Sequence, residues 1–298
     1  MVSAPVLVGV DGSPEGLEAV TVAAREARLR GIGLRVVHAF FWPMMRVPLE
    51  PSSMGPPEGG LRNQAEQVVA EAVRHARGAE PGVEAEGAVV TGDTLPVMVE
   101  ESRGAALTVV GSRGLGAFVG LLLGSTAVHL AAHGHCPVLV VRGEGDPARE
   151  GPVVAGVDGS PSGEAAIEFA FAEASMRGTG LVAVHAWSPW KAEAPPPQDP
   201  AEPYASGSGD LAANEERVLA EALAGRQERY PDVSVDRRVL RGGPREALIE
   251  ASREAALVVV GARGRGGFAG MLLGSVSQAL LHHADCPVAV VRAEPDKR

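Results

Sequence analysis

Short apolar runs alternate with longer amphipathic segments along the chain. Val6–Val10 is a β-branched apolar run, typical of a strand buried on both faces of a sheet. Ser13 and Pro14 follow it. They suit the start of a helix, because a serine hydroxyl can accept an unpaired helix amide and proline has no amide to pair. The helix should run to about Arg30 and end at Gly31, since glycine readily adopts the conformation that stops a helix.

The same alternation continues for the rest of the first half of the chain. We expect, in order, a strand at Leu34–Ala39, a helix at Leu61–Arg77, a strand at Val83–Thr91, a helix capped by Asp93 or Thr94 and ending near Arg103, a strand at Ala106–Gly111, a helix at Gly124–Gly134 and a strand at Pro137–Arg142. Strands that alternate with helices form parallel sheets covered by helices on both faces. The predicted fold class is therefore α/β, with an open parallel sheet of five strands.

The chain contains this pattern twice. The block Leu7–Pro14 (LVGVDGSP) returns as Val154–Pro161 (VAGVDGSP), 147 residues later, and Gly111–Arg142 returns as Gly261–Arg292 at an offset of 150. The offset drifts, so the second copy has small insertions between these blocks. A period of this length indicates duplication of a whole domain, because solenoid repeats are only about 20–50 residues long.

We expect two tandem domains, residues 1–145 and 151–298, joined by a polar stretch. One long segment in each copy interrupts the regular pattern, at Phe41–Gly60 and at Ser188–Asp210. Connections of more than about 12–15 residues are usually functional lids or disordered. Their proline and Gly-Ser content favours disorder.

Composition and charge exclude several classes of protein. The net charge of −10 argues against a nucleic-acid-binding protein, which needs a basic surface. The only lysines are Lys191 and Lys297, and the Gly-Lys-Ser/Thr tripeptide of a Walker-type loop is absent. No apolar run approaches the roughly 20 residues that cross a bilayer, and the first residues do not resemble a signal peptide. The two cysteines cannot form a disulfide framework and fit a reducing compartment. We therefore expect a soluble, cytoplasmic protein without nucleic-acid or membrane partners.

A glycine motif occurs at the same spacing in both copies. It reads Gly111-Ser-Arg-Gly114, nine residues, then Gly124-Ser125, and it recurs as Gly261-Ala-Arg-Gly264, nine residues, then Gly274-Ser275. It follows the carboxyl end of a strand, where open α/β sheets bind ligands, and it opens a helix whose free amides favour phosphate. Arg113 and Arg263 add a cation to each loop. The alternative is that the glycines only form a turn, but recurrence at identical spacing favours a phosphate-binding loop.

An aspartate follows the first strand of each copy, at the same predicted edge of the sheet. Asp11 and Asp158 both stand in the sequence Asp-Gly-Ser. An acidic residue at this place can bind ribose hydroxyls. The alternative is a turn aspartate that accepts hydrogen bonds from its own backbone. The position near the expected reversal of strand order favours the ligand.

These residues together resemble the universal stress protein family in its tandem-domain form. The resemblance rests on the Gly-Val-Asp-Gly-Ser blocks, the Val-His-Ala blocks, the duplicated glycine motif and the two Cys-Pro-Val-x-Val-Val-Arg blocks, and it covers nearly the whole chain. It implies two Rossmann-like, adenine nucleotide alpha hydrolase-like domains, each with strand order 3-2-1-4-5 and one ATP site.

The resemblance also implies roles for particular residues. The two aspartates should meet the ribose and adenine end, Gly9, Ala39, Gly156 and Ala186 should frame the adenine, and the glycine motifs should hold the triphosphate. The full candidate set is Gly9, Asp11, Ser13, Ala39, Gly111, Arg113, Gly114, Gly116, Gly124, Ser125 and Thr126 in the first copy and Gly156, Asp158, Ser160, Ala186, Gly261, Arg263, Gly264, Gly266, Gly274, Ser275 and Val276 in the second. Mg²⁺ should accompany the triphosphate as counter-charge. Thr126 is Val276 in the second copy, so that site lacks one hydroxyl donor and could bind more weakly.

Other chemistry-bearing residues are less convincing candidates. His129, His133 and His135 resemble a metal cluster, but the second copy retains only His283, which argues against a shared metal site. His38 and its repeat His185 end buried strands and are interpreted as structural. Both cysteines precede proline at a strand start and are interpreted as small hydrophobic residues.

The motifs lack a nucleophile–base pair or paired carboxylates, so we predict a binding module whose ATP occupancy changes its conformation or partners. The alternatives are a slow ATPase or autophosphorylating enzyme, with Ser112 or Ser125 as acceptor, and a purely structural dimerisation module. Pro137–Arg142 and Pro287–Arg292 would each be the last strand of a sheet, with unpaired amides and carbonyls. We expect these edges to pair with each other, with further homodimerisation through other surfaces left open.

Overall fold

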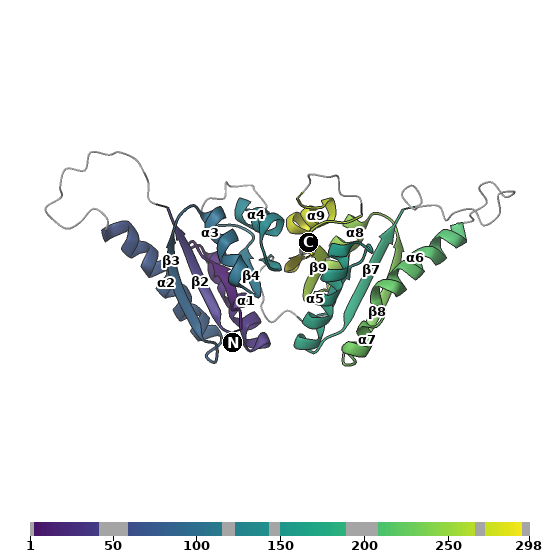
Figure 1. The fold of residues 1–298 in the computed structure, drawn as a ribbon, viewed down its shortest axis with the longest axis horizontal. Coiled ribbons are helices and arrows are strands. Elements are labelled where there is room, and N and C mark those ends of the chain that lie inside the picture. Colours follow the sequence, from purple (N-terminus) through teal and green to yellow (C-terminus); the bar gives the residue numbers. More distant parts are fainter. Residues whose placement is uncertain are drawn as a thin grey trace, which may run out of the picture. The chain divides into compact units, whose positions relative to one another are not determined.

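In the computed structural model the chain divides into two compact units, Met1–Ala148 and Arg149–Arg298 (Figure 1). The structure describes residues 3–41, 59–114, 123–142, 150–188, 208–265 and 272–293. The two long segments after the second strand of each copy fall almost entirely outside these ranges, so the expectation of a lid or disorder there stays a prediction.

The first unit alternates strands and helices as the sequence indicates. Its elements are β1 (Val6–Gly9), α1 (Pro14–Arg30), β2 (Leu34–Phe40), α2 (Gly59–Ala79), β3 (Ala85–Thr91), α3 (Thr94–Glu101), a 3₁₀ turn (Ser102–Gly104), β4 (Leu107–Gly111), α4 (Ser125–His133) and β5 (Val138–Val141). The strand order is β3-β2-β1-β4-β5, and every neighbouring pair is parallel. The predicted five-stranded α/β fold and its strand order are confirmed.

The second unit repeats this architecture. Its elements are β6 (Val153–Gly156), α5 (Pro161–Arg177), β7 (Leu181–Trp187), α6 (Ser208–Leu223), α7 (Arg226–Arg229), β8 (Val235–Arg241), α8 (Pro244–Ser252), β9 (Leu257–Gly261), α9 (Ser275–His283) and β10 (Val288–Val291). The order β8-β7-β6-β9-β10 is again wholly parallel. The short helix α7 falls where the first unit has the last turn of α2, so α6 and α7 together correspond to α2. No helix in the described ranges is both long and apolar enough to cross a membrane.

The start and end of the first helix follow directly from its sequence. The main-chain N–H of Gly16 donates to the Ser13 hydroxyl at 3.1 Å, which satisfies one of the amides that a helix leaves unpaired at its start. Gly31 ends the helix with φ 63° and ψ 35°, a left-handed conformation that costs glycine little. Both predicted ends of α1 are confirmed, and Ser160 and Gly178 have the same roles in α5.

The helix α3 is capped differently from the prediction. Asp93 occupies the N-cap position of α3, but its side chain makes no capping hydrogen bond, so the expected side-chain cap is wrong. The helix also ends at Glu101 and continues as a 3₁₀ turn to Gly104. Likewise β3 begins at Ala85 rather than Val83, whose side chain is buried while its amide closes a turn with the carbonyl of Glu80.

The core of each unit is aliphatic, as the scarcity of aromatic residues requires. Val6, Leu7 and Val8 of β1 are completely buried, as expected for a central strand covered on both faces. In the second unit β10 is equally apolar, with all four of its residues buried. This rigid sheet holds the loops at the carboxyl ends of its strands in place.

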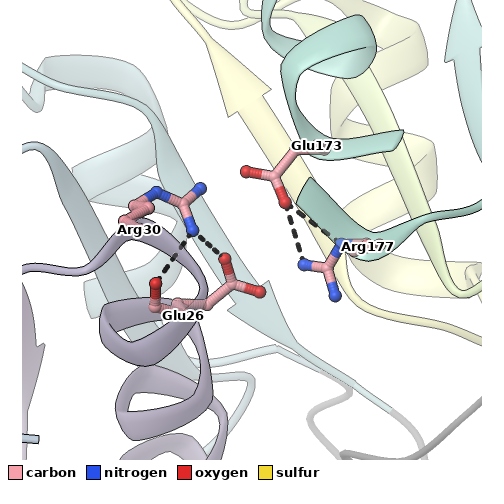
Figure 2. Close-up of polar contacts among 4 residues, drawn as sticks. All are labelled: Glu26, Arg30, Glu173 and Arg177. Atoms are coloured by element: carbon pink, nitrogen blue, oxygen red, sulfur yellow. Dashed lines mark hydrogen bonds and ion pairs between the residues drawn. The ribbon is translucent and has the colours of Figure 1, made fainter. Parts of the chain in front are cut away.

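An ion pair recurs near the end of the first helix of each unit (Figure 2). In α1 the guanidinium of Arg30 bonds the carboxylate of Glu26, whose side chain is only 2% exposed. In α5 Arg177 contacts Glu173 through Nη2 at 2.9 Å and through Nε at 3.1 Å. The pairs occupy equivalent positions in the repeat, and both have i, i+4 spacing, which places the two side chains on one face of a helix.

Candidate functional site

A cavity of about 570 Å³ opens at the carboxyl ends of the strands of the first unit. It is lined by the ends of β1, β2 and β4, by α3, and by the first turn of α4. The lining residues are Gly9, Val10, Asp11, Gly16, Val37, His38, Ala39, Thr94, Met98, Val110, Gly111, Arg113, Gly114, Leu123, Gly124, Ser125, Thr126 and Ala127. This is the edge at which open parallel sheets bind ligands.

Nine predicted residues of the first copy meet in this cavity. They are Gly9, Asp11, Ala39, Gly111, Arg113, Gly114, Gly124, Ser125 and Thr126. Ser13 does not line it: the residue is 2% exposed, and its hydroxyl caps α1 and donates to Asp11. Gly116 and its repeat Gly266 lie outside the described residues. The geometry therefore brings together the adenine, ribose and phosphate candidates at one place.

The glycine loop packs directly against the turn between β1 and α1. A side chain at Gly114 would place its Cβ 2.3 Å from Oδ2 of Asp11, and one at Gly111 would come within 3.0 Å of the carbonyl oxygen of Glu15. The amide of Gly124 donates to the carbonyl of Ser112 at 2.7 Å, which closes the loop onto the start of α4. These glycines are required where the loop approaches another segment of the chain, which the alternative interpretation of the motif as a turn also predicts.

The start of α4 is a polar surface of the cavity. Gly124 occupies its N-cap position and makes no side-chain capping bond, while Ser125 and Thr126 line the cavity from the first turn. Amides at a helix start carry partial positive charge and favour an anion. Arg113 adds a guanidinium, which lies 3.5 Å from the carboxylate of Glu15.

Asp11 fills the turn role as well as lining the cavity. Its Oδ1 accepts from the main-chain N–H of Ser13 at 3.0 Å and from the Ser13 hydroxyl at 2.5 Å. Its Oδ2 is the atom nearest to Gly114. The turn role of this aspartate is confirmed, and its place in the lining leaves the ligand interpretation as a prediction.

Much of the remaining lining is apolar, and part of it comes from β2 and α3. Met98 reaches across to Gly9, where a side chain would place its Cβ 2.9 Å from the methionine Cε. Val37 and Ala39 contribute from β2 and Thr94 from the first turn of α3. Such a surface can accept a flat apolar ring beside polar main-chain groups.

Sequence reasoning missed Gly16, Thr94 and Met98 as lining residues. Gly16 carries a partial signal, because it follows the Asp-Gly-Ser-Pro block in both copies, as Gly163 does in the second. A side chain at Gly16 would come within 3.2 Å of Asp11 Oδ1. Thr94 and Met98 have no local signal and are found only once α3 is packed on the sheet.

The two strand-end histidines are anchored to the main chain. Nδ1 of His38 lies 2.8 Å from the carbonyl oxygen of Val10, and Nδ1 of His185 lies 2.7 Å from that of Val157. His185 also contacts Glu215 of α6 through Nε2 at 2.6 Å, with both side chains buried. The structural interpretation of both residues is confirmed, although His38 also lines the cavity.

The second unit assembles the same parts. A side chain at Gly264 would place its Cβ 2.4 Å from Oδ2 of Asp158, and Oδ1 of this aspartate accepts from the Ser160 amide and hydroxyl at 3.0 Å and 2.7 Å. The amide of Gly274 donates to the carbonyl of Ala262 at 2.7 Å. The remaining predicted residues lie on the same segments: Gly156 ends β6, Ala186 lies near the end of β7, Gly261 ends β9, Arg263 belongs to the loop, and Ser275 and Val276 begin α9.

Comparison with known proteins agrees with this architecture. The family model of the universal stress protein family matches residues 4–142 and 151–292. The universal stress protein Rv2623 of Mycobacterium tuberculosis is 42% identical over 299 residues, with 96% of each chain covered. The universal stress protein Mb2019 of Mycobacterium bovis is 40% identical over 311 residues, covering 98% of this chain and 96% of that protein.

A solved structure shows the same fold over the whole length. The crystal structure of a universal stress protein from Archaeoglobus fulgidus superposes with a TM-score of 0.69 at 20% identity, covering 98% of this chain and 100% of the other. The duplicated motifs, the repeated sheet order and the two family matches lead to one conclusion. The chain belongs to the universal stress protein family, with one family domain in each unit.

Proposed function

We propose that this protein binds ATP, one molecule in each unit, and acts as a regulatory module whose conformation or partners depend on nucleotide occupancy. The observation that carries the proposal is the cavity of the first unit. It joins an apolar lining from β2 and α3 to a glycine loop, an arginine and an uncapped helix start. An adenine nucleotide has the same division, with a flat base at one end and phosphates at the other.

Each group of residues has a physical role in this proposal. The strand ends at Gly9 and Ala39 offer main-chain groups beside the base, and Met98 covers the base with an apolar side chain. Asp11 offers Oδ2 to the ribose hydroxyls while its Oδ1 holds the turn. The amides at the start of α4 and the Arg113 guanidinium neutralise the phosphates.

Mg²⁺ would enter with the triphosphate in this proposal. Among the described residues Asp11 is the only carboxylate that lines the cavity, and these residues include no group of three or more suited to holding a metal ion. Mg²⁺ commonly binds through one or two carboxylates together with substrate phosphates and waters. The donor set therefore suits an ion that is held mainly by the nucleotide, and its role there is to neutralise phosphate charge.

The test begins with mass spectrometry of the purified protein for co-bound nucleotide, followed by calorimetric titration with ATP. Gly114→Glu and Gly264→Glu each place a carboxylate in a phosphate loop, so each should remove one of two binding equivalents. Gly82→Glu is the matched control, because a side chain there meets no other atom within 4 Å. If both loop variants still bind two equivalents, the assigned sites are wrong.

A turnover measurement distinguishes a binding module from an enzyme. ATP hydrolysis by the wild-type protein should not exceed the background of the double variant Gly114→Glu/Gly264→Glu. Hydrolysis well above that background, or phosphate transferred to Ser112 or Ser125, would favour the slow ATPase or autophosphorylating alternative.

The proposal includes pairing of the last strands of the two units. Each of β5 and β10 ends the strand order of its own unit, and an uncovered strand edge promotes association with another edge. The single chain would favour this contact through a high effective concentration. Residues 1–145 expressed alone should therefore self-associate, as measured by sedimentation. A stable monomer at high concentration would contradict the pairing.

A further inference from the structure

The phosphate loops of the two units differ in charge although their glycines are the same. In the first unit the loop cation is balanced: Nη2 of Arg113 lies 3.5 Å from Oε1 of Glu15, the second residue of α1. A negative side chain therefore stands next to the place where phosphates would bind. It weakens the attraction of that loop for an anion.

The second unit replaces this glutamate by serine. Ser162 occupies the position of Glu15 in the aligned blocks, and a side chain at Gly261 would come within 2.8 Å of its carbonyl carbon, just as one at Gly111 would approach Glu15. In the described part of the chain Arg263 forms no ion pair. Glu164, two residues farther along α5, also makes none with the arginines of this loop.

A second arginine is added to the same loop. Arg265 stands where the first copy has Leu115. Its main-chain N–H donates to Oδ2 of Asp158 at 3.1 Å, so the residue is fixed at the candidate ribose end of the site. Its guanidinium lies over the β6–α5 turn, because a side chain at Gly159 would place its Cβ 2.4 Å from Nη2.

An arginine at the end of β10 also lies beside the loop, and the first copy has the same residue, Arg142, at this position. The amide of Ala262 donates to the carbonyl of Val291 at 2.7 Å, which brings Arg292 next to the glycine motif. Its Nη1 atom is buried and has no hydrogen-bond partner among the described residues. Burial and the neighbouring charge of Arg263 lower the pKa of Arg292, as expected for cations gathered without an anion.

We propose that the second unit selects nucleotides by phosphate charge and favours a triphosphate over a monophosphate more strongly than the first unit does, because Arg265 adds a cation and Ser162 replaces the carboxylate that pairs with the loop arginine of the first unit. This inference rests on the proposed function. Beside the second loop, Ser162 in place of Glu15 removes one negative charge and Arg265 in place of Leu115 adds one positive charge. Glu164 in place of Leu17 adds one negative charge, but its side chain is exposed. A buried guanidinium donor without a partner gains most from an anionic ligand.

The test measures AMP, ADP and ATP affinity at each site separately by calorimetry. Gly114→Glu leaves the second site to be measured, and Gly264→Glu leaves the first. The ratio of ATP to AMP affinity should be about tenfold or more larger at the second site, the size expected from two added charge contacts. It should also fall more steeply as salt is raised.

Exchanging the residues between copies makes the test reciprocal. Arg265→Leu and Ser162→Glu should each lower the second site's ATP-to-AMP ratio by about threefold to fivefold, the effect of one partly screened charge pair. Glu15→Ser should raise the ratio at the first site. Arg237→Leu is the control, because this exposed arginine of β8 contacts Gln227 and not the loop.

The outcomes separate this inference from the proposed function. Equal ratios at the two sites, or no change in Arg265→Leu, would overturn charge selection while nucleotide binding itself stands. Nucleotide titrations that are flat at both sites would overturn the proposed function and this inference with it. Reciprocal shifts in the exchanged variants would support the assignment.

Discussion

Replacing Asp11 by asparagine separates its turn role from its proposed ligand role. Oδ1 holds the turn through the Ser13 amide and hydroxyl, and an asparagine oxygen can accept both of these bonds. The change then places an NH₂ group where Oδ2 was, which cannot accept from ribose hydroxyls. A hydrogen bond to a charged group contributes about 1.5–3 kcal/mol, so the affinity for ATP at the first site should fall by about 10- to 150-fold. Stability should stay nearly unchanged.

The assay uses the Gly264→Glu background, so that calorimetry reports only the first site. The protein with Asp11 intact should bind ATP more tightly than the 2′-deoxy and 3′-deoxy analogues of ATP. The Asp11→Asn variant should lose this preference. Asp11→Ala serves as the contrasting variant, because it also removes the turn acceptor and should lower the unfolding midpoint. If Asp11→Asn binds ATP as tightly as wild type, the aspartate is a turn residue only.

Two substitutions and one labelling experiment probe buried or partly buried groups. Glu26→Ala removes the buried carboxylate that Arg30 contacts. In a denaturant titration it should lower the free energy of unfolding of the first unit by about 3–5 kcal/mol. A loss below about 1 kcal/mol would show that the pair contributes little to stability. Glu215→Ala removes the hydrogen-bond partner of His185 and should destabilise α6 by about 1–3 kcal/mol. The amides of that helix should then exchange with solvent faster, and unchanged exchange rates would refute the prediction. Burial raises the pKa of the Cys136 thiol, so its thiolate forms only at higher pH. Alkylation of this thiol should therefore be slow at neutral pH and should accelerate as pH rises. An alkylation rate at neutral pH equal to that of a free cysteine peptide would contradict this prediction.

Features set by residues close together in the chain could be predicted from the sequence. The Ser13 cap and the Gly31 terminus depend on a few neighbouring residues, and both form as expected. The glycine loop was predictable because a parallel sheet brings the carboxyl ends of its strands to one edge, which joins Gly114 to Asp11 across more than a hundred residues. Asp93 shows the limit, since a residue of capping type at the right place still forms no cap.

Features that depend on packing could not be predicted. The pattern of α3 shows an apolar face, but only its position on the sheet brings Thr94 and Met98 to the cavity. From the sequence, a turn role for Asp11 and a place in the binding site looked like alternatives. In the structure Asp11 both holds the turn through Oδ1 and lines the cavity.

The duplication supplies an internal comparison that a single domain would lack. His38 and His185 make the same bond to the main chain, yet among the described residues only His185 has a buried carboxylate beside it, because Glu215 stands where the aligned helix of the first copy has Ala65. Differences of this kind leave the sheet and the glycine motif intact and change only the charges around them. Two sites built on one backbone can therefore diverge in ligand preference without a change of fold, because side-chain charge alters binding free energy far more readily than it alters the packing of a buried parallel sheet.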